Sequence, residues 1–130
     1  MIVLDASAAV DWLLRTPAGM RIEQRIYARQ DSLHTVHLLD VEFAHVLRRL
    51  VHDGKLAPKR AQESIEDMSV LRITRYSPAL LLQRIWQLRQ NLSAYDAAYV
   101  ALAEKLQSPL ITRDRRIPGA AGHKATVEVF

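Results

Sequence analysis

Four acidic side chains of this sequence could form a catalytic or metal-binding site if the fold brings them together: Asp5, Glu42, Asp96 and Asp114. Carboxylates that crowd together repel one another, so such a cluster takes up protons or binds cations. Oxygen ligands without sulfur favour Mg²⁺ or Mn²⁺, and the sequence contains no cysteine. One or two such ions could activate water for attack on a phosphodiester. The acids therefore predict metal-dependent hydrolysis, provided that they meet.

Each acid also has an ordinary structural interpretation. Asp5 precedes a helical segment and could cap it, and Glu42 and Asp96 are expected in the first turns of helices, where the helix dipole favours negative charge. Asp114 could be a turn residue. Taken singly, each acid is better explained as structural, because capping acids outnumber active-site acids.

Apolar, β-branched runs alternate with helical patterns along the chain. The expected strands are residues 2–4, 33–36, 71–76, 110–112 and 127–130. The expected helices are residues 6–14, residues 17–30, a helix from Asp40 that stops at Asp53 and Gly54, one from Pro58, one from Pro78, and one from the N-cap Ser93 to Gln107. Strands separated by helices predict an α/β fold with a central parallel sheet of four or five strands and helices on both faces.

Apolar side chains at helical spacing indicate which faces of these helices are buried. The second helix is expected to bury a loose face of Met20, Ile22, Ile26 and Tyr27. The helix from Pro58 is expected to bury Ile65 and Met68, and the helix from Pro78 carries Leu81, Leu82, Ile85 and Trp86.

The sheet predicts where three of the acids lie. In an open parallel sheet, ligands bind beyond the carboxyl ends of the strands, and Asp5 and Asp114 both follow apolar strand runs. Glu42 begins the helix that leaves the second strand, so we expect it at the same edge. Asp96 belongs to a helix that follows another helix, and connectivity alone does not say which edge it faces.

Length and composition limit the classes of protein to which this chain can belong. We expect one domain over residues 1–130, since 49% hydrophobic and 25% charged residues are typical of globular proteins. The absence of cysteine excludes disulfides and thiolate zinc sites, and no apolar run is long enough to cross a bilayer, so we expect a cytoplasmic protein without membrane contact. A formal charge of +4 fits polyanionic partners and fits a solvated basic surface equally well.

Four segments carry a resemblance to a known family: VLDASAAV, DVEFAHVLRRL, SAYDAAYVALAE and LITRDRRI. They resemble the sequence blocks of PIN domains, and in particular of the VapC toxins of prokaryotic toxin–antitoxin pairs. The resemblance implies a three-layer α/β/α fold and a Mg²⁺-dependent endoribonuclease, with Mn²⁺ as a substitute, that leaves a 5′-phosphate and a 3′-hydroxyl. It also implies an RNA substrate, a VapB-like antitoxin and a homodimer.

The resemblance assigns roles to the acids and to two hydroxyls. It implies that Asp5, Asp96 and Asp114 coordinate metal and that Glu42 holds metal or water. Ser7 and Thr112 are expected to orient these groups, and local backbone hydrogen bonding in turns explains the two hydroxyls equally well. Family members often carry Asn three residues after the Glu, where this chain has His45.

Basic and apolar side chains give weaker expectations. One of Arg113, Arg115 and Arg116 is expected to contact RNA phosphate, since guanidinium groups match phosphate oxygens; a solvated loop is the alternative. Arg48 and Arg49 are expected on the solvent side of their helix. Residues 12–14, Trp-Leu-Leu, are expected in the core or, by the family resemblance, at an antitoxin contact. The five histidines form no ligand spacing.

Two other functions compete with the enzyme. A non-catalytic RNA-binding or regulatory module could use the same fold, although such a binder has no need of four acids. A receiver-like phosphotransfer domain also binds Mg²⁺ in an acidic pocket. That interpretation lacks a suitably placed phosphoacceptor Asp and a Lys at the end of a late strand.

Overall fold

The computed structural model describes residues 1–130 and contains one sheet of five parallel strands, in the order β3-β2-β1-β4-β5. The strands are β1 (Ile2–Leu4), β2 (Leu33–Val36), β3 (Ile73–Tyr76), β4 (Leu110–Thr112) and β5 (Val127–Val129). The helices are α1 (Ala6–Leu13), α2 (Pro17–Arg29), α3 (Leu38–His52), α4 (Pro58–Val70), the 3-10 helix η1 (Pro78–Leu81), α5 (Leu82–Gln87) and α6 (Ala94–Leu106). None of them combines the length and hydropathy that crossing a bilayer requires.

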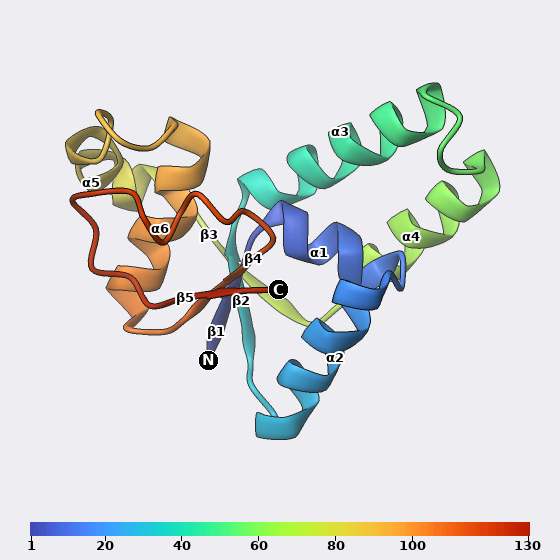
Figure 1. Ribbon diagram of the computed structural model, residues 1–130, viewed down its shortest axis with the longest axis horizontal. Coiled ribbons are helices and arrows are strands. Elements are labelled where there is room, and N and C mark those ends of the chain that lie inside the picture. Colours follow the sequence, from blue (N-terminus) through green and yellow to red (C-terminus); the bar gives the residue numbers. More distant parts are fainter.

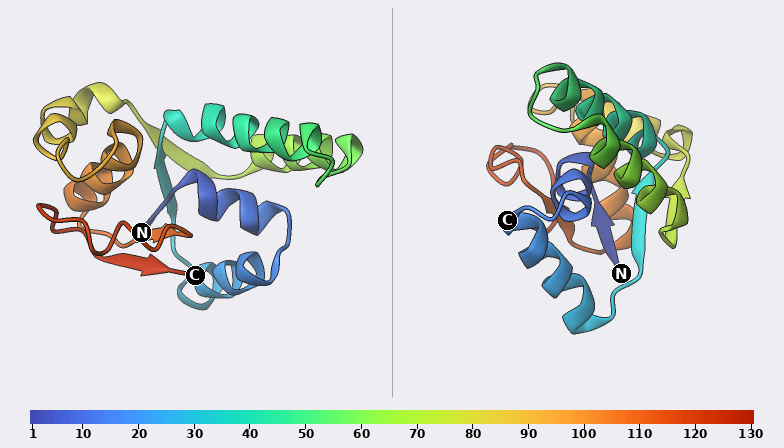
Figure 2. Two further views of the ribbon diagram at one scale, coloured as in Figure 1. Left: turned by 45° about the horizontal axis from the view of Figure 1, so that its top comes forward. Right: turned by 90° about the vertical axis from the view of Figure 1, so that its right-hand side faces the viewer.

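Helices cover both faces of the sheet. Helices α1 to α4 lie on one side of it and α5 and α6 lie on the other (Figures 1 and 2). This arrangement confirms the three-layer α/β/α fold that the sequence predicts. The beginnings of α1, α3 and α6 all lie toward the carboxyl ends of the strands (Figure 1).

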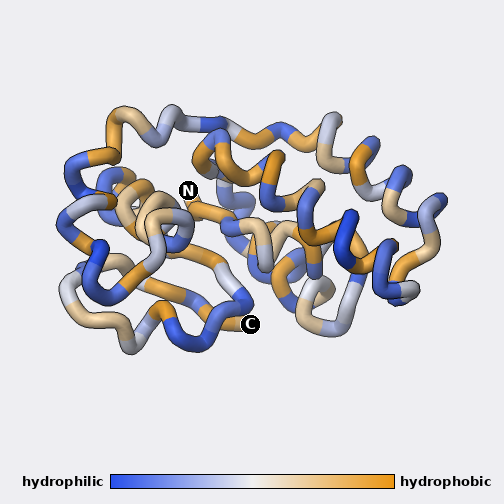
Figure 3. Tube along the Cα trace, turned by 90° about the horizontal axis from the view of Figure 1, so that it is seen from above, coloured by the Kyte–Doolittle hydropathy of each residue, from blue (hydrophilic) through white to orange (hydrophobic).

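The three central strands form the middle of the core. Strands β1, β2 and β4 are buried along their whole length, whereas β3 and β5, at the edges, are only partly covered. Strands that are covered on both faces are read as continuous apolar runs, which explains why Ile2–Leu4 and Leu110–Thr112 were recognisable. In Figure 3 the chain has the hydrophobic colour where it leaves the N-terminus along β1.

The junction of α1 and α2 depends on a glycine. Thr16 caps α2, because its hydroxyl accepts a hydrogen bond from Gly19 N at 3.0 Å, and Pro17 occupies the first turn. A Cβ at Gly19 would lie 1.8 Å from the carbonyl oxygen of Asp11. Only glycine therefore allows the two helices to approach this closely.

Several expected details were wrong. The helix from Pro78 is divided into η1 and α5, and Leu82 and Trp86 are exposed. On α2 and α4, the side chains of Met20, Tyr27 and Ile65 are exposed, because the buried stripes pass instead through smaller residues and through single apolar positions. These stripes consist of Ala18, Gly19, Ile22 and Ile26 on α2 and of Ala61, Ser64 and Met68 on α4.

Candidate active site

Two of the four acids lie at the ends of neighbouring strands. β1 and β4 pair in parallel, with Val3 opposite Leu110 and Leu4 opposite Ile111. Asp5 follows β1 directly, and Asp114 lies two residues beyond the end of β4. The structure therefore brings both carboxylates to the carboxyl edge of the sheet, as their positions after the strands predicted.

Asp5 is both a helix cap and the most buried of the acids. Its side chain is only 5% exposed and accepts hydrogen bonds from Ala8 N at 2.9 Å, from Ser7 Oγ at 2.7 Å and from the hydroxyl of Thr112. Burial raises the pKa of Asp5 from its ordinary 3.8 to about 6, and the charge of Asp96 adds to this rise, while the three hydrogen bonds oppose it. The capping interpretation of Asp5 is thus correct, and it leaves a carboxylate whose charge lacks compensation.

Ser7 and Thr112 connect this carboxylate to the turn after β4. Thr112 donates to Asp5 and accepts a hydrogen bond from Asp114 N at 3.0 Å. Ser7 donates to Asp5 and accepts one from Arg113 N at 2.9 Å. Both hydroxyls therefore orient the carboxylate. Thr112 also binds local backbone in the turn, whereas the backbone partner of Ser7 belongs to a distant segment of the chain.

Asp96 reaches the same edge from the other layer. Ser93 caps α6 by accepting a hydrogen bond from Asp96 N at 3.1 Å, which places Asp96 in the first turn, as expected. Its pKa is raised, mainly by burial and further by the charge of Asp114. The charge of Asp96 in turn raises the pKa of Asp5 and of Glu42. The question that connectivity left open is answered, since Asp96 lies within electrostatic reach of all three other acids.

Glu42 is held by a tyrosine that sequence reasoning missed. The hydroxyl of Tyr99 donates a 2.7 Å hydrogen bond to Glu42 Oε1, and burial followed by the charge of Asp96 raises the pKa of this half-buried carboxyl. Glu42 lies in the second turn of α3, not in the first, because the helix already begins at Leu38. Tyr99 follows Asp96 by three residues on one helix, and this spacing was the available signal.

The arginines near Asp114 have separate partners. Arg116 binds both oxygens of Asp114, with Nη2 to Oδ2 at 2.7 Å and Nε to Oδ1 at 3.0 Å, and its guanidinium lowers the pKa of this carboxyl. Arg113 is occupied by Asp11 and by the carbonyl of Phe130. Arg115 is exposed and has no ion pair or side-chain hydrogen bond, so it is the one of the three that is free to meet a ligand.

The chemistry of the donor set fits a hard divalent cation. The four acids offer carboxylate oxygens, and the pKa values of Asp5, Asp96 and Glu42 are raised by burial and by the charges of neighbouring acids, which a bound cation would relieve. As arranged, no three Asp, Glu or His side chains are close enough to ligate one ion together. An ion at this edge would therefore keep several waters, as Mg²⁺ commonly does.

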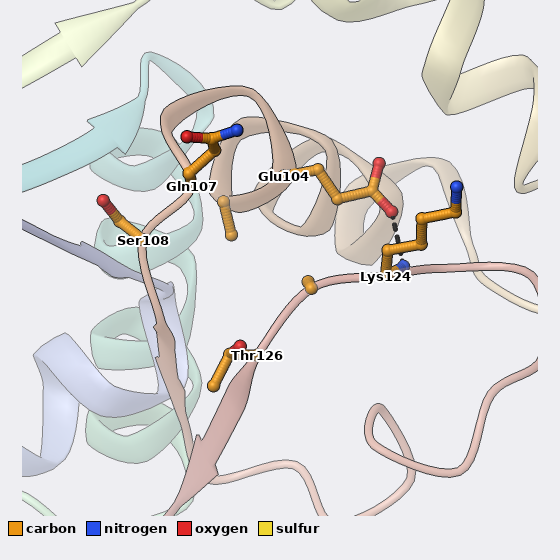
Figure 4. A pocket seen from close by; sticks show the side chains of 7 residues that line it. Glu104, Gln107, Ser108, Lys124 and Thr126 are labelled. Carbon is orange, nitrogen blue, oxygen red and sulfur yellow. Dashed lines mark hydrogen bonds between the residues drawn. The ribbon is translucent and has the colours of Figure 1, made fainter.

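A different hollow lies away from the acids. It measures about 480 Å³ and is lined by residues from α6, from the connection between α6 and β4 and from the segment before β5 (Figure 4). Its acid, Glu104, already binds Arg84 at 2.7 Å and Lys124 N at 2.7 Å. None of the four acids lines it, so it is not the candidate active site.

Comparisons with known proteins identify the family and match the fold. The sequence matches the PIN domain family over residues 2–122. It is 43% identical over 117 residues to ribonuclease VapC9 of Mycobacterium tuberculosis. The matched residues cover 90% of this chain and 88% of the relative. The solved structure of M. tuberculosis VapC20, a toxin that cleaves the sarcin–ricin loop, has a TM-score of 0.69 at 16% identity, covering 95% of this chain and 97% of that one. VapBC2 of Rickettsia felis, bound to a promoter DNA fragment, also has a TM-score of 0.69, at 14% identity and with coverage of 99% and 98%.

Proposed function

The chain belongs to the PIN domain family, and on that premise we propose that it is a metal-dependent endoribonuclease that acts as the toxin of a toxin–antitoxin pair. The observation that carries the proposal is the placement of the acids at one edge of the sheet. Asp5 and Asp114 follow the paired strands β1 and β4, and α6, which begins at the same edge, carries Asp96 and also Tyr99, the hydrogen-bond donor to Glu42. The 43% identity to a protein named as a ribonuclease supports RNA as the substrate.

Each acid has a proposed task in hydrolysis. Asp5, Asp96 and Asp114 hold Mg²⁺ or Mn²⁺, and Glu42, fixed by the Tyr99 hydroxyl, holds metal or positions water. The bound ion would supply charge stabilisation on the phosphate oxygens and a more acidic water. The water oxygen bonds to phosphorus, the bond to the 3′ oxygen breaks, and that oxygen takes a proton. The products are a 5′-phosphate and a 3′-hydroxyl.

The burial of the acids argues for catalysis over simple RNA binding. An RNA-binding surface neutralises phosphates with lysine and arginine, whereas buried carboxylates repel them. Burying Asp5 costs free energy, since the charged form of the side chain is disfavoured there. A module that only bound RNA would gain nothing from this arrangement. A cation held between the acids and a phosphate would offset their repulsion and assist hydrolysis.

Cleavage of a labelled structured RNA tests the function. Purified protein is incubated with Mg²⁺ or Mn²⁺, with chelator, and as the variants Asp5→Asn and Asp96→Asn. Asp53→Asn is the matched control, because Asp53 is an exposed acid at the far end of α3 with no side-chain partner. We expect cutting by wild type and by the control, and none with chelator or in the site variants. Cutting that survives chelator and both site substitutions would contradict the proposal.

The antitoxin is proposed to contact the face formed by α1, α2 and α4. Trp12 and Leu13 are buried, so most of the expected contact segment is core. They nevertheless line a hollow of about 220 Å³, beside which Tyr27 and Val70 are 66% and 81% exposed. Exposed apolar side chains at a groove are typical of a peptide-binding surface. Loss of inhibition by a co-expressed antitoxin in Tyr27→Ser, with RNA cleavage unchanged, is the expected result.

A further inference from the structure

We propose that the hollow between α3 and the start of α6 seats the base of a nucleotide next to the cut phosphate, with Tyr95 as its stacking surface. This inference rests on the proposed ribonuclease function and names a binding subsite for the RNA strand. The hollow measures about 530 Å³ and is lined by seven residues: Leu38, Val41, Glu42, His45, Val46, Arg49 and Tyr95. Its volume lies within the usual range of small-molecule sites.

The hollow is continuous with the acids. Glu42 lines it and also accepts the hydrogen bond from Tyr99 within the acidic group. Tyr95 directly precedes Asp96 on the first turn of α6. A strand whose phosphate lies at the acids therefore has an adjacent nucleotide at the hollow.

Tyr95 is available for stacking. Its side chain is 60% exposed, and its hydroxyl has no hydrogen-bond partner within the chain. Val41, 70% exposed, lies at the same hollow and adds apolar surface. Bases stack on aromatic rings largely irrespective of sequence, because every base has a π face.

Two free basic groups border the hollow. His45 and Arg49 are four residues apart on α3 and so share one face of the helix, and both are exposed without a side-chain hydrogen bond or an ion pair. The guanidinium of Arg49 attracts the phosphates that flank a seated base, and an imidazole N–H can donate a hydrogen bond to them. Arg48, the neighbouring arginine, lines a different hollow between α3 and α4.

The same lining argues against a second copy of this chain as the occupant. A protein interface at this place would bury Glu42, His45 and Arg49. Neither His45 nor Arg49 has a side-chain partner within this chain. Burying charges without partners is costly, whereas a nucleotide brings its own phosphate. The mixture of aromatic, basic and apolar groups therefore favours RNA.

RNA affinity of paired variants tests the subsite. Binding of a fluorescent single-stranded RNA of mixed sequence is measured by anisotropy with Mg²⁺ in an Asp5→Asn background, which is expected not to cut. We expect Tyr95→Leu to weaken binding about tenfold, and Tyr95→Phe and Tyr95→Trp to stay near the parent affinity. Arg49→Gln should weaken binding and lower the salt dependence by about one counterion, whereas Arg48→Gln, a matched control, should do neither.

A spectroscopic readout separates stacking from a structural effect. 2-Aminopurine is placed at successive positions of the RNA, and its fluorescence is expected to be quenched at one position by the parent and by Tyr95→Trp, but not by Tyr95→Leu. Unchanged affinity in Tyr95→Leu, or equal losses in Arg48→Gln and Arg49→Gln, would overturn the subsite. A dimer lost in Tyr95→Leu with RNA affinity unchanged would instead assign the hollow to a second copy.

The wild-type cleavage assay keeps the two proposals apart. Metal-dependent cutting together with unchanged affinity in Tyr95→Leu would overturn the subsite alone. Absence of cutting together with the expected losses in Tyr95→Leu and Arg49→Gln would support the subsite and overturn the enzyme in favour of an RNA-binding module.

Discussion

The substitution Asp5→Asn isolates the cost of burying a carboxylate at the edge of the sheet. The folded-state pKa of Asp5 is about 6, against an ordinary value of 3.8. This difference corresponds to about 3 kcal/mol, since one pKa unit is about 1.4 kcal/mol. Asparagine has nearly the same shape and no charge, so it keeps the site filled and removes the titration.

The sign follows from which state holds the proton. Well below its ordinary pKa of 3.8 the carboxyl is protonated in the folded and unfolded states, and its titration costs nothing. Between pH 4 and pH 6 the unfolded chain releases the proton first, so stability falls as the pH rises through this window. Above pH 6 the folded state is ionised as well, and the full cost remains.

Urea unfolding of metal-free wild type and Asp5→Asn at pH 4 and pH 8 measures this cost. Comparing the two pH values within each protein cancels the hydrogen bonds that asparagine makes differently with Ala8 and Thr112. Between pH 4 and pH 8, we expect wild type to lose about 2.5 kcal/mol more than the variant does, because part of the cost is already present at pH 4. The exposed-acid variant Asp53→Asn should follow wild type. Identical pH dependence in wild type and Asp5→Asn would refute the reasoning, because Asp5 would then ionise in the fold as easily as in water.

Three further predictions concern packing, orientation and charge. Gly19→Ala should destabilise the protein by about 3 kcal/mol in urea unfolding, since its Cβ would collide with backbone. Gly119→Ala should change little, because a Cβ there would meet only Arg116 O at an ordinary 4.0 Å. Equal stability of the two variants would contradict the close helix contact. Thr112→Val should raise the pKa of Asp5 further and shift the acid limb of the pH–rate profile to higher pH, because a hydrogen bond that favours the charged form is lost. Thr112→Ser keeps the hydroxyl and should not shift it. An unchanged profile in Thr112→Val would count against the role of this hydroxyl. Arg116→Gln should tighten Mn²⁺ binding in calorimetry without RNA, because the guanidinium no longer competes for its carboxylate partner; weaker binding would show that the arginine supports the metal instead.

The three central strands could be predicted from the sequence because they are buried along their whole length, whereas the edge strands β3 and β5 are only partly covered. β2 and β4 have the predicted bounds, and β1 is a short apolar run that an acid ends. The helix from Pro78 was harder to predict. Its Leu82 and Trp86 are exposed, so their spacing did not report burial, and the segment forms a 3-10 turn followed by a short helix.

The site could be predicted in part. Parallel strands end at one edge, which is enough to place Asp5 and Asp114 together. Asp96 could not be placed this way, because the direction of α6 depends on how it packs against β1, β2 and β4. The spacing of Tyr99 from Asp96 indicates a shared helix face, but it does not reveal that the partner of Tyr99 is Glu42 on another helix. The pairing of Arg116 with Asp114 depends on a flexible, exposed side chain that the sequence pattern does not place.

Anomalous diffraction from crystals soaked in Mn²⁺ tests the central claim most directly. We expect a manganese peak at the carboxyl edge of the sheet, with carboxylate oxygens of Asp5 and Asp96 among its ligands or hydrogen-bonded to its waters, and no such peak in Asp96→Asn. Manganese bound only elsewhere, or a peak at this edge that persists without the Asp96 carboxylate, would contradict a shared metal site.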